Sequence, residues 1–181
     1  MKHIQLFIAL LVCVLAAHGQ EKFLTKTGNA SFFSDGIIED IKADNSRVLS
    51  IIDTKDGSIA IAILMKSFMF EKSLMQEHFN ENYVESDTYP KATFKGVIKD
   101  FETLSTTPKD VTVAGDITIH GVTKTVEIRA KITKTDDHIA LTGNFPIKLV
   151  DFNIKIPTIV IKNIAETVAV NFDLDHKPYT K

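Results

Sequence analysis

Apolar and polar residues alternate along most of this chain, or apolar residues form short runs between polar turns. These patterns predict strands over Phe23–Phe33, Arg47–Asp53, Ile59–Met65, Lys91–Lys99, Val111–Ile119, Val126–Thr133, Ile139–Ile147 and Val168–Leu174. Alternation gives each strand one dry and one wet face, which is typical of antiparallel sheets. There is no strand–helix–strand alternation. We therefore predict an all-β fold, a meander of about eight strands that closes into an antiparallel barrel and so removes its exposed edges.

One stretch near the middle of the chain breaks the alternation. Leu74, Met75, His78 and Phe79 recur at helical spacing, and Tyr89-Pro90 ends the segment before the next strand. The pattern predicts a short helical insertion near residues 71–80. At the C-terminus, the polar tail Asp175–Lys181 is expected to fray.

The first residues have the pattern of a secretory signal peptide. A basic start, Met1–His3, precedes the apolar run Ile4–Ala17, and small residues before Gln20 suit a signal peptidase. We predict a signal peptide over residues 1–19, a single domain over 20–181, and a periplasmic or secreted protein. The apolar run is too short for a membrane span, which needs about 20 residues. A lipoprotein leader ending at Cys13 is the rival, but Val12 is bulky where such leaders carry a small residue.

Composition excludes several classes of function. The net charge is −2 and no basic cluster is present, so we expect no nucleic-acid partner. Cys13 is the only cysteine, which leaves no thiol chemistry after the leader. No two histidines stand four residues apart, and Glu77-His78 lacks the second histidine of a zinc-protease motif. We therefore predict no metal, no cofactor and no enzymatic activity, and we read Asp136-Asp137 as a turn.

Two motifs carry a family resemblance. Glu77–Tyr83 followed by Tyr89–Gly96, and then Gly115–Lys124, resemble the two signatures of YceI-like proteins. The signature residues are His78, Phe79, Tyr89, Pro90, His120, Gly121, Thr123 and Lys124. Asp151–Ile154 departs from the pattern, because Asn153 stands where many relatives have glycine. The resemblance implies a lipocalin-like barrel that holds a long isoprenoid or another lipid, in the periplasm or outside the cell.

Glycines occupy several positions on the inward face of the predicted barrel. Gly96, Gly115 and Gly143 fall on the apolar faces of their strands, which either leaves room for an apolar ligand or merely allows bends. Together with the resemblance, the pattern favours a ligand tunnel. Its candidate lining residues are Phe68, Phe70, Leu74, Met75, Phe79, Phe94, Ile98, Ile117, Ile119, Val126, Ile128, Phe145 and Phe172.

The leading hypothesis is an exported binding protein that holds a long-chain amphiphile, such as a polyisoprenoid, an isoprenoid quinone or a fatty-acid-like lipid. The alternative is a non-catalytic interaction or structural barrel with a filled core, which acts through its surface. An enzyme that acts on a lipid held in the tunnel is a third hypothesis. Replacing His120 by alanine would test it, since loss of turnover with a retained fold would support an enzyme. We expect His120 instead to hydrogen-bond its own turn. The sequence is also compatible with a homodimer that extends the tunnel.

Overall fold

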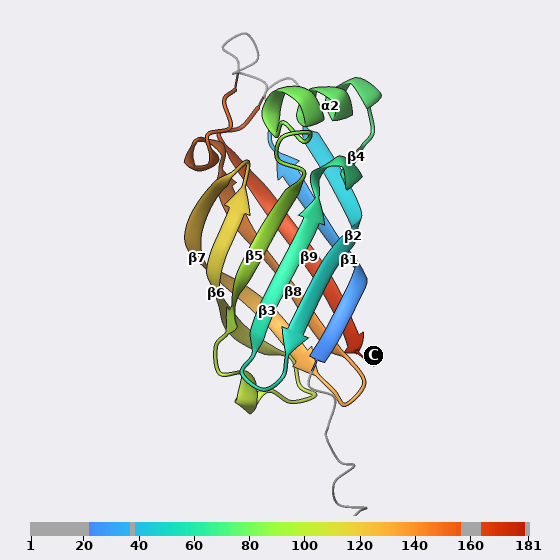
Figure 1. Cartoon of the computed structure of the whole chain (residues 1–181), viewed down its shortest axis with the longest axis vertical. Coiled ribbons are helices and arrows are strands. Elements are labelled where there is room, and N and C mark those ends of the chain that lie inside the picture. The colour runs from blue at the N-terminus through green and yellow to red at the C-terminus, as the bar shows by residue number, and fades with distance from the viewer. Residues whose placement is uncertain (1–21, 37–38, 157–163, 180–181) are drawn as a thin grey trace, which may run out of the picture.

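The computed structural model describes residues 22–36, 39–156 and 164–179, and in these it forms a closed antiparallel β-barrel (Figure 1). Its long strands are β1 (Lys22–Ser34), β2 (Ile41–Asp53), β3 (Ser58–Leu64), β5 (Lys91–Ile98), β6 (Lys109–Ile119), β7 (Val122–Lys134), β8 (Ile139–Lys148) and β9 (Thr167–Pro178). Neighbouring strands pair in the order β1-β9-β8-β7-β6-β5-β3-β2, and β1 also pairs with β2, which closes the barrel. The predicted fold class is confirmed. The predicted signal peptide lies outside the described residues.

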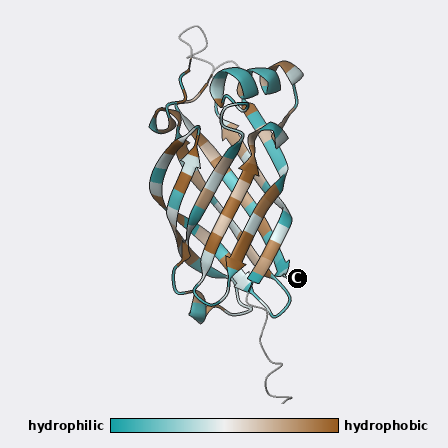
Figure 2. Ribbon diagram, in the orientation of Figure 1, coloured by the Kyte–Doolittle hydropathy of each residue, from teal (hydrophilic) through white to brown (hydrophobic). Residues whose placement is uncertain are grey.

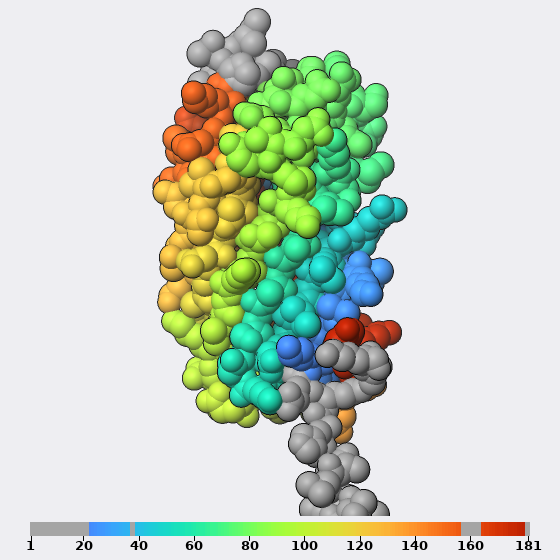
Figure 3. All heavy atoms as spheres, viewed as in Figure 1, coloured from blue at the N-terminus to red at the C-terminus, as the bar shows by residue number. Residues whose placement is uncertain are grey.

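The helical insertion is also confirmed. Helix α2 (Ser73–His78) runs into one wide helical turn, η2 (Phe79–Tyr83), and together they cover one end of the barrel (Figures 1 and 3). A two-residue strand, β4 (Met69–Phe70), pairs with β2 and leads the chain into the helix. We call this the α2 end of the barrel.

The opposite end is filled by a tight core, and we call it the closed end. Its central side chains are at most 1% exposed; they are Ile52, Ile98, Ile139, Leu141 and Leu174. The alternation of apolar and polar positions is visible along the strands in Figure 2. Full burial of an aliphatic side chain contributes about 1.5–3 kcal/mol, so this end supplies much of the stability of the fold.

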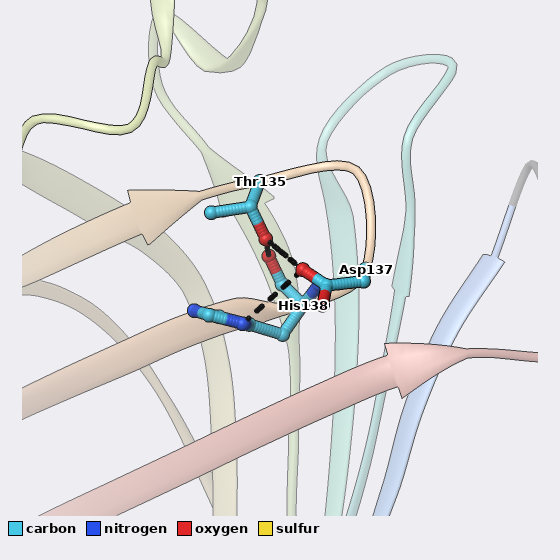
Figure 4. A network of polar contacts seen from close by, with 3 residues as sticks. All are labelled: Thr135, Asp137 and His138. Carbon is cyan, nitrogen blue, oxygen red and sulfur yellow. Dashed lines mark hydrogen bonds and ion pairs between the residues drawn. The ribbon is translucent and has the colours of Figure 1, made fainter.

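The turn between β7 and β8 at the closed end is held by its own side chains (Figure 4). Thr135 Oγ1 donates to Asp137 Oδ1 at 2.5 Å, and the backbone N–H of His138 donates back to Thr135 Oγ1 at 3.0 Å. The Thr135 hydroxyl holds the pKa of the Asp137 carboxyl below its usual value. The two aspartates are therefore turn residues, as predicted.

The prediction that the tail frays from Asp175 is wrong. Strand β9 continues to Pro178, and His176 within it is fully buried. Its Nδ1–H donates to the Ile139 carbonyl at 2.9 Å, which leaves Nε2 to accept from the Ser50 hydroxyl at 2.8 Å. Both ring nitrogens are satisfied, so a polar residue is accommodated in the core.

The inward glycines allow close packing and leave no empty space. Gly96 and Gly115 are cross-strand partners, and a Cβ on Gly115 would lie 2.3 Å from the Lys95 carbonyl oxygen. A Cβ on Gly96 would meet the Phe94 ring at 2.7 Å. The prediction that these glycines leave room for a ligand is therefore wrong at Gly96 and Gly115, and the ladder there has no register shift that would mark a bulge.

The ladder between β7 and β8 is incomplete. It has five pairs, from Lys134↔Ile139 to Ala130↔Gly143. All residues of both strands are described, and no pair joins Val122–Arg129 of β7 to Asn144–Lys148 of β8. Pro146 lies in the part of β8 that pairs with β9 but not with β7, and proline is confined to strand edges because it has no N–H to donate. The two strands therefore separate toward the α2 end.

Candidate functional site

An apolar cavity of about 300 Å³ lies inside the barrel at the α2 end. Strands β1, β2, β3, β5, β6, β8 and β9 contribute to its walls, and α2 and η2 cover it. Seven of the predicted tunnel residues line it: Phe68, Phe70, Met75, Phe79, Ile117, Ile119 and Phe145. Few polar side chains reach it, among them Ser34, His78 and Tyr83. Burial raises the pKa of the Tyr83 phenol, so this group brings no charge to the cavity.

Aromatic rings form the wall between the cavity and the helix. The Phe32 ring stacks on Phe79 with centroids 5.4 Å apart, and it meets Phe68 and Phe70 edge-on at 5.5 and 5.8 Å. Such pairs add about 0.5–1.5 kcal/mol beyond their burial. Sequence reasoning missed Phe32, although it alternates with Ala30 and Ser34 in β1, and both of these also line the cavity.

The other predicted tunnel residues do not line the cavity. Leu74 is 59% exposed on the outer side of α2, so it does not share the inward side with Met75. Phe94, Ile98 and Ile128 are buried outside the cavity lining. Val126 and Phe172 are only half-buried and also lie outside it.

The two signature segments meet at the rim of the α2 end. The rings of Tyr89 and His120 pack edge-on with centroids 4.6 Å apart. Gly121 has φ +74°, and a Cβ there would lie 2.6 Å from the Tyr89 ring. Only glycine satisfies both the left-handed backbone and this close approach. In the same rim, the Pro90 carbonyl accepts from the Met65 N–H at 3.0 Å.

His120 bonds a different segment from the one we predicted. Its Nδ1 donates to the carbonyl oxygen of Phe152 at 3.1 Å, in the short helical turn η4 (Leu149–Phe152), and not to its own turn. Its Nε2 lies 3.3 Å from Glu85 Oε1 without hydrogen-bond geometry. His120 thus fastens η4 to the rim. Asn153, which follows η4, has φ +56°, a left-handed conformation that asparagine tolerates better than most residues.

The remaining signature residues lie near this rim. His78 extends from α2 to the cavity, and Phe79 packs in the aromatic wall. Thr123 shares a hydrogen bond of 2.8 Å with Thr118 on the neighbouring strand. Lys124 is exposed, although its cross-strand partner Ile117 lines the cavity.

The described residues contain no group of three or more His, Cys, Asp or Glu side chains placed to hold a metal ion. The hydrogen bond between Ser50 and His176 has the length found in a nucleophile–base pair. Both residues are fully buried, however, and the second ring nitrogen of His176 bonds a backbone carbonyl where a catalytic carboxylate would be. A substrate could not reach this serine.

No helix within the described residues is long and apolar enough to cross a membrane.

The fold, the lined cavity and the signature rim define a small antiparallel β-barrel with an apolar cavity at one end. The chain belongs to the YceI-like family, because the YceI-like domain model matches residues 19–176. A comparison with curated proteins found no match.

Solved structures share the fold at low identity. One is described as a polyisoprenoid binding domain from Saccharophagus degradans implicated in plant cell wall breakdown; it has a TM-score of 0.77 and 17% identity, over 88% of this chain and 99% of that one. Burkholderia cenocepacia BcnA has a TM-score of 0.69 and 20% identity, over 82% and 95% of the two chains. The YceI protein of Campylobacter jejuni has a TM-score of 0.60 and 18% identity, over 78% and 87%.

Proposed function

We propose that this protein is an exported, non-catalytic binding protein that holds the apolar chain of a long-chain amphiphile in the cavity beneath α2. The observation that carries the proposal is the cavity itself, which is enclosed by a barrel and lined almost entirely by apolar side chains. The similarity to a polyisoprenoid binding domain supports an isoprenoid alcohol or quinone as the ligand class. Export rests on the leader pattern of residues 1–19.

Burial of the chain would drive binding. Each methylene group removed from water contributes about 0.8 kcal/mol, so affinity should rise with chain length until the available space is full. Methionine suits such a wall because its unbranched side chain adapts to irregular apolar shapes, and Met65 and Met75 both line the cavity. The alternative, a barrel with a filled core that acts through its surface, is disfavoured by the 300 Å³ of open volume.

The direct test is native mass spectrometry of gently purified protein, before and after solvent extraction. We expect extra mass that leaves with the solvent and is identified as an isoprenoid or a similar lipid. Delipidated protein should then take up retinol, a fluorescent isoprenoid alcohol. A protein that carries no lipid and takes up neither retinol nor a fatty acid would contradict the proposal.

A variant that fills the cavity should compete with the ligand. Ala92 lines the cavity on β5, so Ala92→Leu is expected to raise the Kd for retinol by about tenfold, because one or two methylene contacts are lost to the new side chain. Ala114→Leu is the matched control, since Ala114 lies on β6 outside the cavity lining. Fluorescence titration measures both, and equal affinity for retinol in the two variants would place the ligand elsewhere.

A further inference from the structure

The opening between β7 and β8 has defined margins. On one side it ends at the last ladder pair, Ala130↔Gly143. On the other it ends at η4, which packs against β7 and is fastened by the hydrogen bond from His120 to Phe152. Between these margins the two strands make no backbone pairs, and Pro146 has no N–H with which to form one there. The barrel wall is therefore interrupted over a limited stretch.

The inner face of the barrel reaches solvent at this opening. Residues opposite each other on paired strands share a face, so Lys124 points to the same side as Ile117, which lines the cavity. Lys124 is nevertheless exposed. Phe145 and Phe172, on the inward faces of β8 and β9, are only half-buried, whereas Leu141 and Leu174 nearer the closed end are at most 1% exposed.

A cleft on the outer surface leads to the same place. It runs along β7 and β8 and is lined by outward-facing residues such as Arg129 and Asn144 and by inward-facing ones such as Ile128. Phe145 lines both this cleft and the cavity. Its ring packs against Phe172, with centroids 6.3 Å apart. Phe145, with Phe172 packed against it, thus stands where the cleft and the cavity adjoin.

The cavity by itself has little room for a long chain. Its volume of about 300 Å³ is at the lower end of the range for ligand pockets, about 300–1,000 Å³. A chain cannot continue toward the closed end, because Ile98, Ile139 and Leu141 fill it. Among the described residues, the routes left for length in excess of the cavity are past α2 and between β7 and β8.

We propose that the opening between β7 and β8 is a lateral portal, gated by Phe145, through which the chain of the ligand passes between the cavity and the outer cleft. This inference rests on the proposed function. It also indicates the kind of head group. Four basic and four acidic side chains line the cleft, so it offers no excess of positive charge to an anion and fits a neutral polar end such as an alcohol or a quinone.

The test is to bridge the portal and measure ligand exchange. Arg129 and Asn144 follow the last ladder pair in register and are both exposed. In an Arg129→Cys/Asn144→Cys variant, a short bismaleimide would span the opening. The matched control is the same bridge in Lys95→Cys/Asp116→Cys, an exposed pair within the uninterrupted ladder between β5 and β6. N-ethylmaleimide in place of the bismaleimide controls for labelling alone.

We expect the bridge across the portal to slow both uptake and release of retinol by about tenfold with little change in Kd, as blocking a route does. The control bridge should leave both rates unchanged. Phe145→Ala should release retinol faster than Phe70→Ala, which removes a comparable cavity contact beneath α2. Equal rates with and without the portal bridge, in protein that binds retinol, would overturn the portal alone. No uptake of retinol or fatty acid by the unmodified protein would overturn the proposed function as well.

Discussion

Replacing His176 by alanine is expected to lower the free energy of unfolding by about 3 kcal/mol, because it removes buried volume and leaves two buried polar groups without partners. Those groups are the Ile139 carbonyl and the Ser50 hydroxyl, which His176 links across the closed end. Urea denaturation followed by circular dichroism measures the change. His138→Ala is the control, since His138 has a partly exposed ring in a turn. The free energy of unfolding of this variant should change by no more than about 0.5 kcal/mol.

The same residue should make stability depend on pH. Burial lowers the pKa of His176, opposed in part by the hydrogen bond to Ile139. The unfolded chain protonates this ring near its ordinary pKa of about 6.5, while the folded barrel still holds it neutral, so the unfolded state binds more protons. His176 therefore contributes fully above about pH 6.5, and stability falls as the pH decreases below that value toward the lowered pKa.

His176→Gln provides the comparison, because glutamine can bond both partners and does not titrate. Its free energy of unfolding should change less than that of the original protein between about pH 7.5 and pH 5. Identical pH profiles for the two proteins would mean that His176 does not set this dependence.

Replacing Gly115 by alanine is the second change with a large expected effect. The new Cβ would lie 2.3 Å from the Lys95 carbonyl oxygen and 2.5 Å from the Gly96 Cα, and both are backbone atoms of a paired strand. Relief requires β5 and β6 to move apart, so we expect a loss of about 3 kcal/mol or more in the free energy of unfolding. Denaturant titration of the purified variant measures it.

Gly28→Ala is the matched control for this clash. Its Cβ would meet the end of the Leu174 side chain at 2.5 Å, and a side chain can rotate where a carbonyl in a ladder cannot. We expect the control to lose less stability than Gly115→Ala. If the two variants lose the same free energy of unfolding, the contact of the new Cβ with backbone atoms at Gly115 destabilises the barrel no more than a contact with a side chain.

The barrel and its helix follow from the sequence because alternation reports directly which face of a strand is buried. The same alternation does not report how far along the barrel axis a residue lies. Ile98 and Ile119 are equally apolar and both point inward, yet only Ile119, which lies toward the α2 end, lines the cavity. Seven of the thirteen predicted residues therefore line the cavity, whereas the boundary between the cavity and the packed core could not be predicted.

Two local features needed information beyond alternation. The polar composition of Asp175–Lys181 predicts a frayed tail, whereas β9 continues to Pro178 because the Ile139 carbonyl and the Ser50 hydroxyl satisfy the buried His176 ring. The sequence signal for the opening between β7 and β8 is Pro146, within an otherwise regular strand. Proline there indicates a lost ladder bond, but only the register shows how far the strands separate.

The division of the barrel into a closed end and a hollow end has an evolutionary consequence. Substitutions around the cavity alter side chains that already border empty space, so they cost less stability than substitutions among Ile52, Ile139 and Leu174. Selection can then reshape the hollow half for new ligands while the closed half continues to specify the fold. Divergence of this kind agrees with structural relatives that keep the barrel at 17–20% identity.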